Sequence, residues 1–128
     1  MSVATLEHVN FTVSDPKKTA AMLCNLFGWK IRWEGAAIAG GHTVHVGSDS
    51  DYLAVYSGPT GKQTKAQDSY SQLGGMNHVA IVVDDLDATE DKVRGVGFET
   101  TNHGEYEPGR RFYFRDGDNI EYEIVSYA

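Results

Sequence analysis

Two stretches of the chain are dominated by apolar and β-branched residues, and each carries a histidine at its third position. They are residues 6–13 and 76–83, with His8 and His78 separated by 70 residues. Both stretches have the composition of a buried strand. The pattern therefore predicts an internal repeat in which the two histidines occupy equivalent positions.

A helix is expected after each of these strands. Ser14 or Asp15 can cap the first helix, and Pro16 suits its first position. The acidic run at 84–87 favours the start of the second. The apolar stripes expected to be buried are Ala20, Leu23, Cys24 and Phe27 in the first helix and Leu86, Val93 and Val96 in the second. Each helix should end at a glycine before an aromatic residue, Gly28 and Gly97.

Three short extended segments follow each helix. They are expected near 29–33, 42–46 and 52–56 in the first unit and near 98–102, 111–115 and 121–125 in the second, separated by turn residues. Each unit is thus predicted to be a β-α-β-β-β module. We place the modules at about 5–57 and 76–126 of one domain spanning 1–128, joined by a polar linker at about 58–75.

Strand alternation identifies the side chains that share a face with the histidines. In the last strand Glu121 and Glu123 lie on one face, and Tyr122 and Ile124 lie on the other. A carboxylate within a sheet is costly to bury without a cation, so Glu123 is a candidate metal ligand. Glu121 lies nearer a turn, where we expect it to be solvated.

The paired modules, the histidine in each first strand and the closing segment 116–124 resemble the vicinal oxygen chelate superfamily. This group includes glyoxalase I, extradiol dioxygenases, fosfomycin-resistance transferases and bleomycin-binding proteins. The resemblance covers residues 6–125 and implies an α+β fold whose mixed sheets curl into an open cup. Glu123 falls on the metal-ligand position of the family, although Gly117 replaces its usual proline and Asn119 stands where glycine is common.

The resemblance also implies that metal ligands come from the first and last strands of each module. Alignment of the two modules puts Ala54 opposite Glu123, and alanine cannot bind a metal. The expected ligands are therefore His8, His78 and Glu123. Two histidines and one carboxylate suit Fe or Mn and would also hold Zn or Ni.

Two residues of the penultimate strand are candidate catalytic groups. We expect Arg111 and Tyr113 to face the metal, with Phe112 and Phe114 on the opposite face. Arg111 would bind an acidic group of the substrate, and Tyr113 would donate a hydrogen bond to an oxygen that gains charge. The competing interpretation makes Arg111 a surface charge and Tyr113 a packing residue.

The remaining histidines are expected at the surface. They are His42, which the alignment makes the equivalent of Arg111, His45, which lies on the opposite face, and His103. Trp33 is expected in the core or in a pocket wall, where it can stack on an aromatic ligand.

Charge and composition narrow the possible partners. The net charge of −7 argues against nucleic acid or an anionic membrane surface as a partner. A single cysteine, Cys24, rules out an internal disulfide, and no apolar run is long enough to cross a membrane. We expect a cytoplasmic protein.

The leading hypothesis is a metal-dependent enzyme whose small oxygenated substrate chelates the metal through two neighbouring oxygens. The alternative is a metal-free protein that binds a small molecule, as bleomycin-resistance proteins do. We also expect a homodimer, because each open half-barrel has sheet edges to cover. The resemblance implies that subunits often exchange modules, and the linker would allow either arrangement. If modules are exchanged, His8 of one subunit meets His78 and Glu123 of the other.

Overall fold

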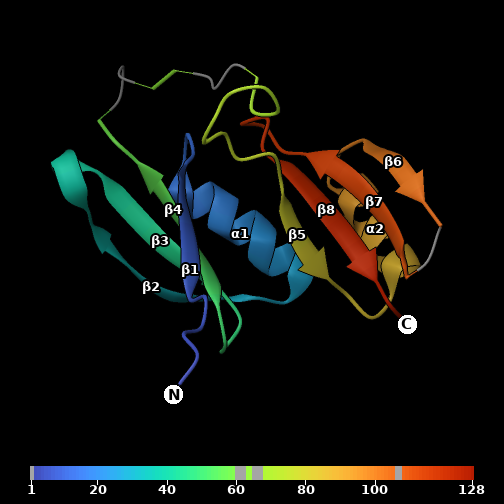
Figure 1. The fold of residues 1–128 in the computed structure, drawn as a ribbon. Coiled ribbons are helices and arrows are strands. Elements are labelled where there is room, and N and C mark those ends of the chain that lie inside the picture. Colours follow the sequence, from blue (N-terminus) through green and yellow to red (C-terminus); the bar gives the residue numbers. More distant parts are fainter. Residues whose placement is uncertain (1, 60–62, 65–67, 106–107) are drawn as a thin grey trace. The chain divides into compact units, whose positions relative to one another are not determined.

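The computed structural model describes residues 2–59, 63–64, 68–105 and 108–128. The chain divides into two compact units, residues 1–64 and 65–128. Each unit runs through a strand, a helix and three further strands, and each forms a four-stranded mixed sheet (Figure 1). The predicted α+β class and the β-α-β-β-β modules are confirmed. The predicted linker at 58–75 lies partly outside the described residues, and its role stays a prediction.

The first unit is a sheet with strand order β1-β4-β3-β2 and one α-helix. Its elements are β1 (His8–Thr12), α1 (Pro16–Phe27), β2 (Lys30–Ala36), the 3-10 turn η1 (Ile38–Gly40), β3 (His42–Gly47) and β4 (Tyr52–Ser57). Asp15 caps α1, since its side chain accepts a hydrogen bond from the Lys18 backbone N–H at 3.3 Å. The helix ends at Gly28, whose φ of +69° is left-handed, as predicted.

The second unit repeats this arrangement with strand order β5-β8-β7-β6. Its elements are β5 (Val79–Val82), α2 (Leu86–Gly95), β6 (Thr100–Gly104), β7 (Arg110–Arg115) and β8 (Glu121–Ser126). Asp85 caps α2 by accepting from the Ala88 N–H at 3.0 Å. The helix ends two residues earlier than predicted, at Gly95, and Val96 is 46% exposed. Val96 therefore does not belong to the buried stripe.

Each helix covers one face of the sheet in its own unit (Figure 1). The buried apolar side chains include Leu23, Val44, Val46 and Val55 in the first unit and Val93, Phe112, Phe114, Tyr122 and Ile124 in the second. Because side chains alternate along a strand, the opposite face of each sheet carries the candidate site residues. Among the described residues, no helix has the length and apolar character needed to cross a membrane.

Candidate functional site

Strands β7 and β8 place three of the predicted site residues on one face of the second sheet. The register pairs Tyr113 with Glu123, and Arg111 with Val125. Strand β5 pairs Ala80 with Glu123, so the residue two positions earlier, His78, lies on the same side. The expected facing of Arg111 and Tyr113 agrees with this register, since Phe112 and Phe114 are buried on the opposite, helix-covered face.

The Glu123 carboxylate is the centre of this cluster. Its Oε1 lies 3.1 Å from His78 Nε2, and its Oε2 accepts a 2.9 Å hydrogen bond from Arg111 Nη1. The Tyr113 ring meets the His78 ring edge-on, with centroids 5.6 Å apart and an interplanar angle of 86°. Only 11% of the Glu123 side chain is exposed. Burial without a cation would be costly, and both Arg111 and His78 offset that cost.

The pair of His78 and Glu123 fits two ligands of one metal ion. Metal–ligand bonds of about 2.1 Å that meet near a right angle leave their donor atoms about 3.0 Å apart. The 3.1 Å between His78 Nε2 and Glu123 Oε1 is close to that spacing. His78 Nδ1 is buried and has no hydrogen-bond partner among the described residues. Within those same residues, no three His, Cys, Asp or Glu side chains gather into a metal-binding group.

Glu121 was expected to be solvated, but it is buried. It is 6% exposed, its Oε1 accepts a hydrogen bond from the Tyr70 hydroxyl, and Arg115 Nη2 lies 3.4 Å from its Oε2. The hydrogen bond to Glu121 raises the pKa of Tyr70. Sequence reasoning missed Tyr70, because it lies in the polar linker, where no periodicity assigns a side chain to a face.

His8, the third predicted ligand, stands at the start of β1 in the first unit. It pairs with Tyr52 of β4, and their rings stack with centroids 4.8 Å apart. Glu7 Oε1 lies 2.8 Å from His8 Nδ1 and also accepts a 3.1 Å hydrogen bond from the Tyr52 hydroxyl. These two contacts lower the pKa of Glu7. The sequence did not indicate the roles of Glu7 and Tyr52.

His45 also belongs to the face that carries His8, which corrects the expectation that it points away. It pairs with Ala54, just as Tyr113 pairs with Glu123 in the second unit, so His45 is the equivalent of Tyr113. His45 is half-buried. Its ring stacks on Tyr52 at 4.7 Å and lies 5.1 Å from Trp33, which is 50% exposed. Burial, together with the nearby His8, lowers the pKa of His45. The result is an aromatic wall made of His8, Trp33, His45 and Tyr52.

The register also corrects the alignment of the two modules. His42 pairs with Ser57, just as Arg110 pairs with Ser126, so His42 corresponds to Arg110 and not to Arg111. It is half-buried, and its Nε2 lies 3.4 Å from Glu34 Oε1. The alignment was therefore wrong by one residue in this strand, although it holds for Ala54, whose neighbours in the sheet match those of Glu123.

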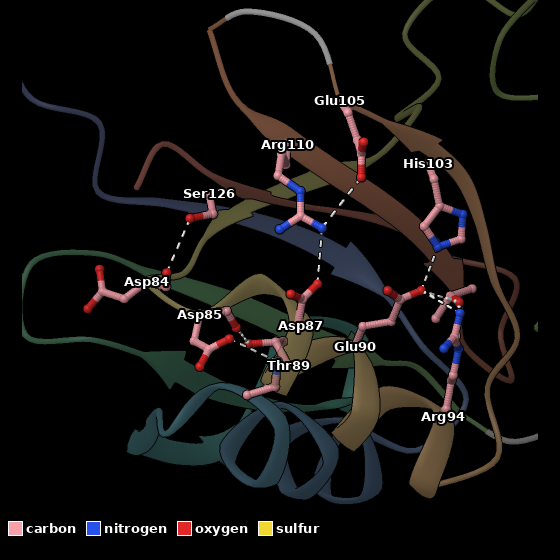
Figure 2. A network of polar contacts seen from close by, with 12 residues as sticks. Asp84, Asp85, Asp87, Thr89, Glu90, Arg94, His103, Glu105, Arg110 and Ser126 are labelled. Atoms are coloured by element: carbon pink, nitrogen blue, oxygen red, sulfur yellow. Dashed lines mark hydrogen bonds and ion pairs between the residues drawn. The ribbon is translucent and has the colours of Figure 1, made fainter.

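A separate polar network lies where α2 packs beside β6 and β7 (Figure 2). Glu90 accepts hydrogen bonds from Thr100 and Arg94 and contacts His103. Arg110 binds Asp87 at 3.0 Å and lies 3.6 Å from Glu105. His103 is exposed, as predicted. We regard this network as structural, since each buried polar group in it is paired within the network.

Comparisons with known proteins bear on the whole chain. The model of the Glyoxalase/Bleomycin resistance protein/Dioxygenase superfamily matches residues 5–124. A glyoxylase/bleomycin resistance protein/dioxygenase domain from Frankia sp. EAN1pec is similar in structure, with 23% identity, 98% of both chains covered and a TM-score of 0.81. No curated protein matches this chain.

Two further solved structures have the same fold. The fosfomycin resistance protein FosX from Listeria monocytogenes, complexed with Mn(II) and a sulfate ion, has 20% identity and a TM-score of 0.71 over 98% of this chain and 93% of its own. A glyoxalase I mutant from Zea mays has 16% identity and a TM-score of 0.76, over 92% of this chain and 43% of its own. At these identities, the likeness concerns the fold.

Proposed function

Because the chain belongs to the Glyoxalase/Bleomycin resistance protein/Dioxygenase superfamily, we propose that it is a metal-dependent enzyme with a small oxygenated substrate. His8, His78 and Glu123 would hold a divalent metal, which the substrate would chelate through two neighbouring oxygens. The observation that carries the proposal is the 3.1 Å approach of His78 Nε2 to Glu123 Oε1 on the open face of the second sheet. FosX, which has this fold and was crystallised with Mn(II), supports it.

The donor set agrees with the metals that this proposal requires. Imidazole nitrogen and carboxylate oxygen suit Mn or Fe, and they also accept Zn or Ni. When bound, the metal would supply Lewis acidity to the chelating oxygens. Ala54 fills the position equivalent to Glu123, so the first unit offers no second carboxylate there.

Arg111 and Tyr113 have the roles of orienting and stabilising groups in this proposal. Arg111 Nη1 holds one oxygen of Glu123 at 2.9 Å, which leaves the other oxygen aimed at His78. The guanidinium also carries further N–H donors, which suit an acidic group of the substrate. The Tyr113 hydroxyl donates a hydrogen bond to the substrate oxygen on which charge develops.

We further propose that the protein is a homodimer whose subunits exchange modules. Strands β1 and β5 are each the last strand of their sheet, and such edges present unpaired backbone groups that a neighbouring strand or chain can cover. In the exchanged arrangement, His8 comes from one subunit while His78 and Glu123 come from the other.

Metal content tests the proposed site directly. The protein is purified without chelators, equilibrated with Mn, Fe, Zn or Ni, and analysed for bound metal. We expect one metal per chain in the wild type and a loss of at least tenfold in affinity in His8→Ala, His78→Ala and Glu123→Gln. His103→Ala, which alters the network of Figure 2 and not the proposed site, should bind as the wild type does. Equal binding by His78→Ala and the wild type would contradict the proposal.

The alternative, a metal-free binding protein, draws support from the aromatic wall. Trp33, which is 50% exposed and lies beside His45, offers stacking surface for a planar ligand. An apoprotein that binds aromatic compounds with unchanged affinity after chelation would favour this alternative. Metal-dependent turnover of α-hydroxy acids, α-keto acids, catechols or glutathione hemithioacetals would favour the enzyme.

Subunit mixing tests the exchanged dimer. A His8→Ala chain and a Glu123→Ala chain each lack one ligand in every homodimer. If modules are exchanged, one site of a mixed dimer contains all three ligands, and the other site lacks both His8 and Glu123. Metal binding then returns in part. Light scattering that gives a monomer at micromolar concentration would contradict the dimer.

A further inference from the structure

The two repeat-related histidines are held in different ways by their own units. His8 has a carboxylate at Nδ1, because Glu7 Oε1 lies 2.8 Å from that nitrogen. His78 has its carboxylate at the other ring nitrogen, since Glu123 Oε1 lies 3.1 Å from Nε2. An ionised carboxylate only accepts hydrogen bonds, so Nδ1 of His8, which is hydrogen-bonded to Glu7, carries the hydrogen. The neutral His8 ring is therefore the Nδ1–H tautomer.

The position equivalent to Glu7 in the second unit explains the difference. It is Asn77, whose side-chain amide donates to the Ser69 carbonyl at 2.8 Å and is thus engaged with the segment before β5. His78 Nδ1 has no hydrogen-bond partner among the described residues. The sequence repeats the histidine but not the group that orients its Nδ1.

Tyr52 holds both Glu7 and His8 in place. Its hydroxyl donates to Glu7 Oε1 at 3.1 Å, and its ring lies nearly parallel to the His8 ring, with an interplanar angle of 14°. The Arg32 guanidinium carbon lies 4.5 Å from the centroid of the Tyr52 ring. Although 65% of the Glu7 side chain is exposed, the carboxylate thus has two hydrogen-bonding contacts, and the imidazole is stacked against a fixed aromatic ring.

We propose that Glu7, held by Tyr52, is a positioning residue that keeps the hydrogen of His8 on Nδ1 and leaves the Nε2 lone pair available to a metal. The inference rests on the proposed function, in which His8 is a ligand. A ligating histidine ordinarily donates its other ring N–H to a carboxylate or carbonyl, and loss of such a partner costs metal affinity. Glu7 supplies that partner before any metal arrives.

The tautomers can be measured in the metal-free protein. Long-range ¹H–¹⁵N correlation spectra at about pH 8, above the ordinary histidine pKa of about 6.5, distinguish a proton on Nδ1 from one on Nε2. We expect His8 to carry it on Nδ1. Glu7→Ala should move His8 toward the Nε2–H form, Glu7→Gln should retain part of the original state through its amide oxygen, and the matched control Asn77→Ala should leave His8 unchanged. A His8 spectrum that does not respond to Glu7→Ala overturns the inference.

Mn(II) affinity, measured by electron paramagnetic resonance of the free ion, provides the second readout. Glu7→Ala should weaken binding by about 10- to 100-fold, and Tyr52→Phe, which keeps the stacked ring, should weaken it less. Asn77→Ala should bind as the wild type does. If the wild type binds no Mn(II), the proposed function fails while the tautomers still decide the role of Glu7. If Glu7→Ala binds as tightly as the wild type, the positioning role is refuted and the metal site stands.

Discussion

Arg111 and Glu123 meet diagonally across neighbouring strands of the second sheet. The register pairs Arg111 with Val125 and Glu123 with Tyr113, yet Arg111 Nη1 donates to Glu123 Oε2 at 2.9 Å. The two side chains are only 15% and 11% exposed. Solvent screens a pair of this kind weakly, so the loss of one partner leaves a charge with little water to stabilise it.

Arg111→Ala should lower the free energy of unfolding by about 2 kcal/mol. The loss stays below that expected for an isolated buried pair, because His78 still contacts the other oxygen of Glu123. Urea unfolding measures the change. Arg115→Ala is the control, since Arg115 is 44% exposed and lies 3.4 Å from Glu121, and it should cost less than about 1 kcal/mol. Equal losses in the two variants would contradict the prediction that the buried Arg111 contributes more to stability than the exposed Arg115.

Tyr122→Phe should destabilise the second unit through the turn between β7 and β8. The Tyr122 ring is fully buried, and its hydroxyl donates to Asp116 Oδ2 at 3.0 Å. The other Asp116 oxygen accepts the N–H groups of Asp118 and Ile120. Removal of the hydroxyl leaves a half-buried carboxylate under-satisfied, so we expect a loss of about 1–2 kcal/mol in urea unfolding. Tyr127→Phe, at a residue that is 57% exposed, should change stability by less than about 0.5 kcal/mol.

The fold was predictable because its signals are local. Apolar periodicity marked the helices and strands, and single residues marked their ends, as Asp15 and Gly28 do for α1. Each of these signals acts over a few positions of the sequence. The end of α2 was placed two residues late, because a glycine before an aromatic residue was taken as the helix end. Gly97 does have a left-handed φ, but the helix already stops at Gly95.

The candidate site was predictable only in part. Strand alternation placed Glu123, Arg111 and Tyr113 on one face, because that rule needs no tertiary information. The contact of Tyr70 with Glu121 joins residues 51 positions apart, and that of Tyr52 with Glu7 joins residues 45 positions apart. No local pattern encodes such contacts. The facing of His45 was missed for a different reason, since a shift of one residue in a strand reverses every side chain.

Replacement of two glycines by alanine should change the free energy of unfolding in opposite directions. Gly28 ends α1 with a φ of +69°, where a Cβ is strained even though no atom lies within 4 Å of it. Gly28→Ala should therefore lower the free energy of unfolding by about 1 kcal/mol. Gly95 is the last residue of α2, has no positive φ and also has open space around a Cβ. Gly95→Ala should raise stability by about 0.5–1 kcal/mol. Thermal unfolding of both variants tests the pair, and a change of the same sign in both would contradict it.

The acid sensitivity of the second unit should depend on Glu90. Burial acts to raise the pKa of this carboxyl, but hydrogen bonds from Thr100 and His103 outweigh it and set the pKa below its ordinary 4.5 (Figure 2). A group whose pKa is lower in the folded state stabilises the protein above its unfolded pKa. That contribution is lost as the pH falls through the folded value. Glu90 therefore favours folding at neutral pH and ceases to do so in acid.

Glu90→Gln should remove this pH dependence along with part of the stability. At pH 7 the variant should unfold at lower urea concentration than the wild type, because Arg94 and His103 lose their charged acceptor. The difference should shrink as the pH falls below 4.5, the ordinary pKa of the carboxyl, since the wild type then loses the same interaction. Urea titrations from pH 7 to about pH 3 measure both effects. Asp91→Asn, an exposed carboxylate of the same helix, is the matched control and should keep the slope of the wild type. A difference between Glu90→Gln and the wild type that stays constant with pH would show that Glu90 acts by packing and not by its charge.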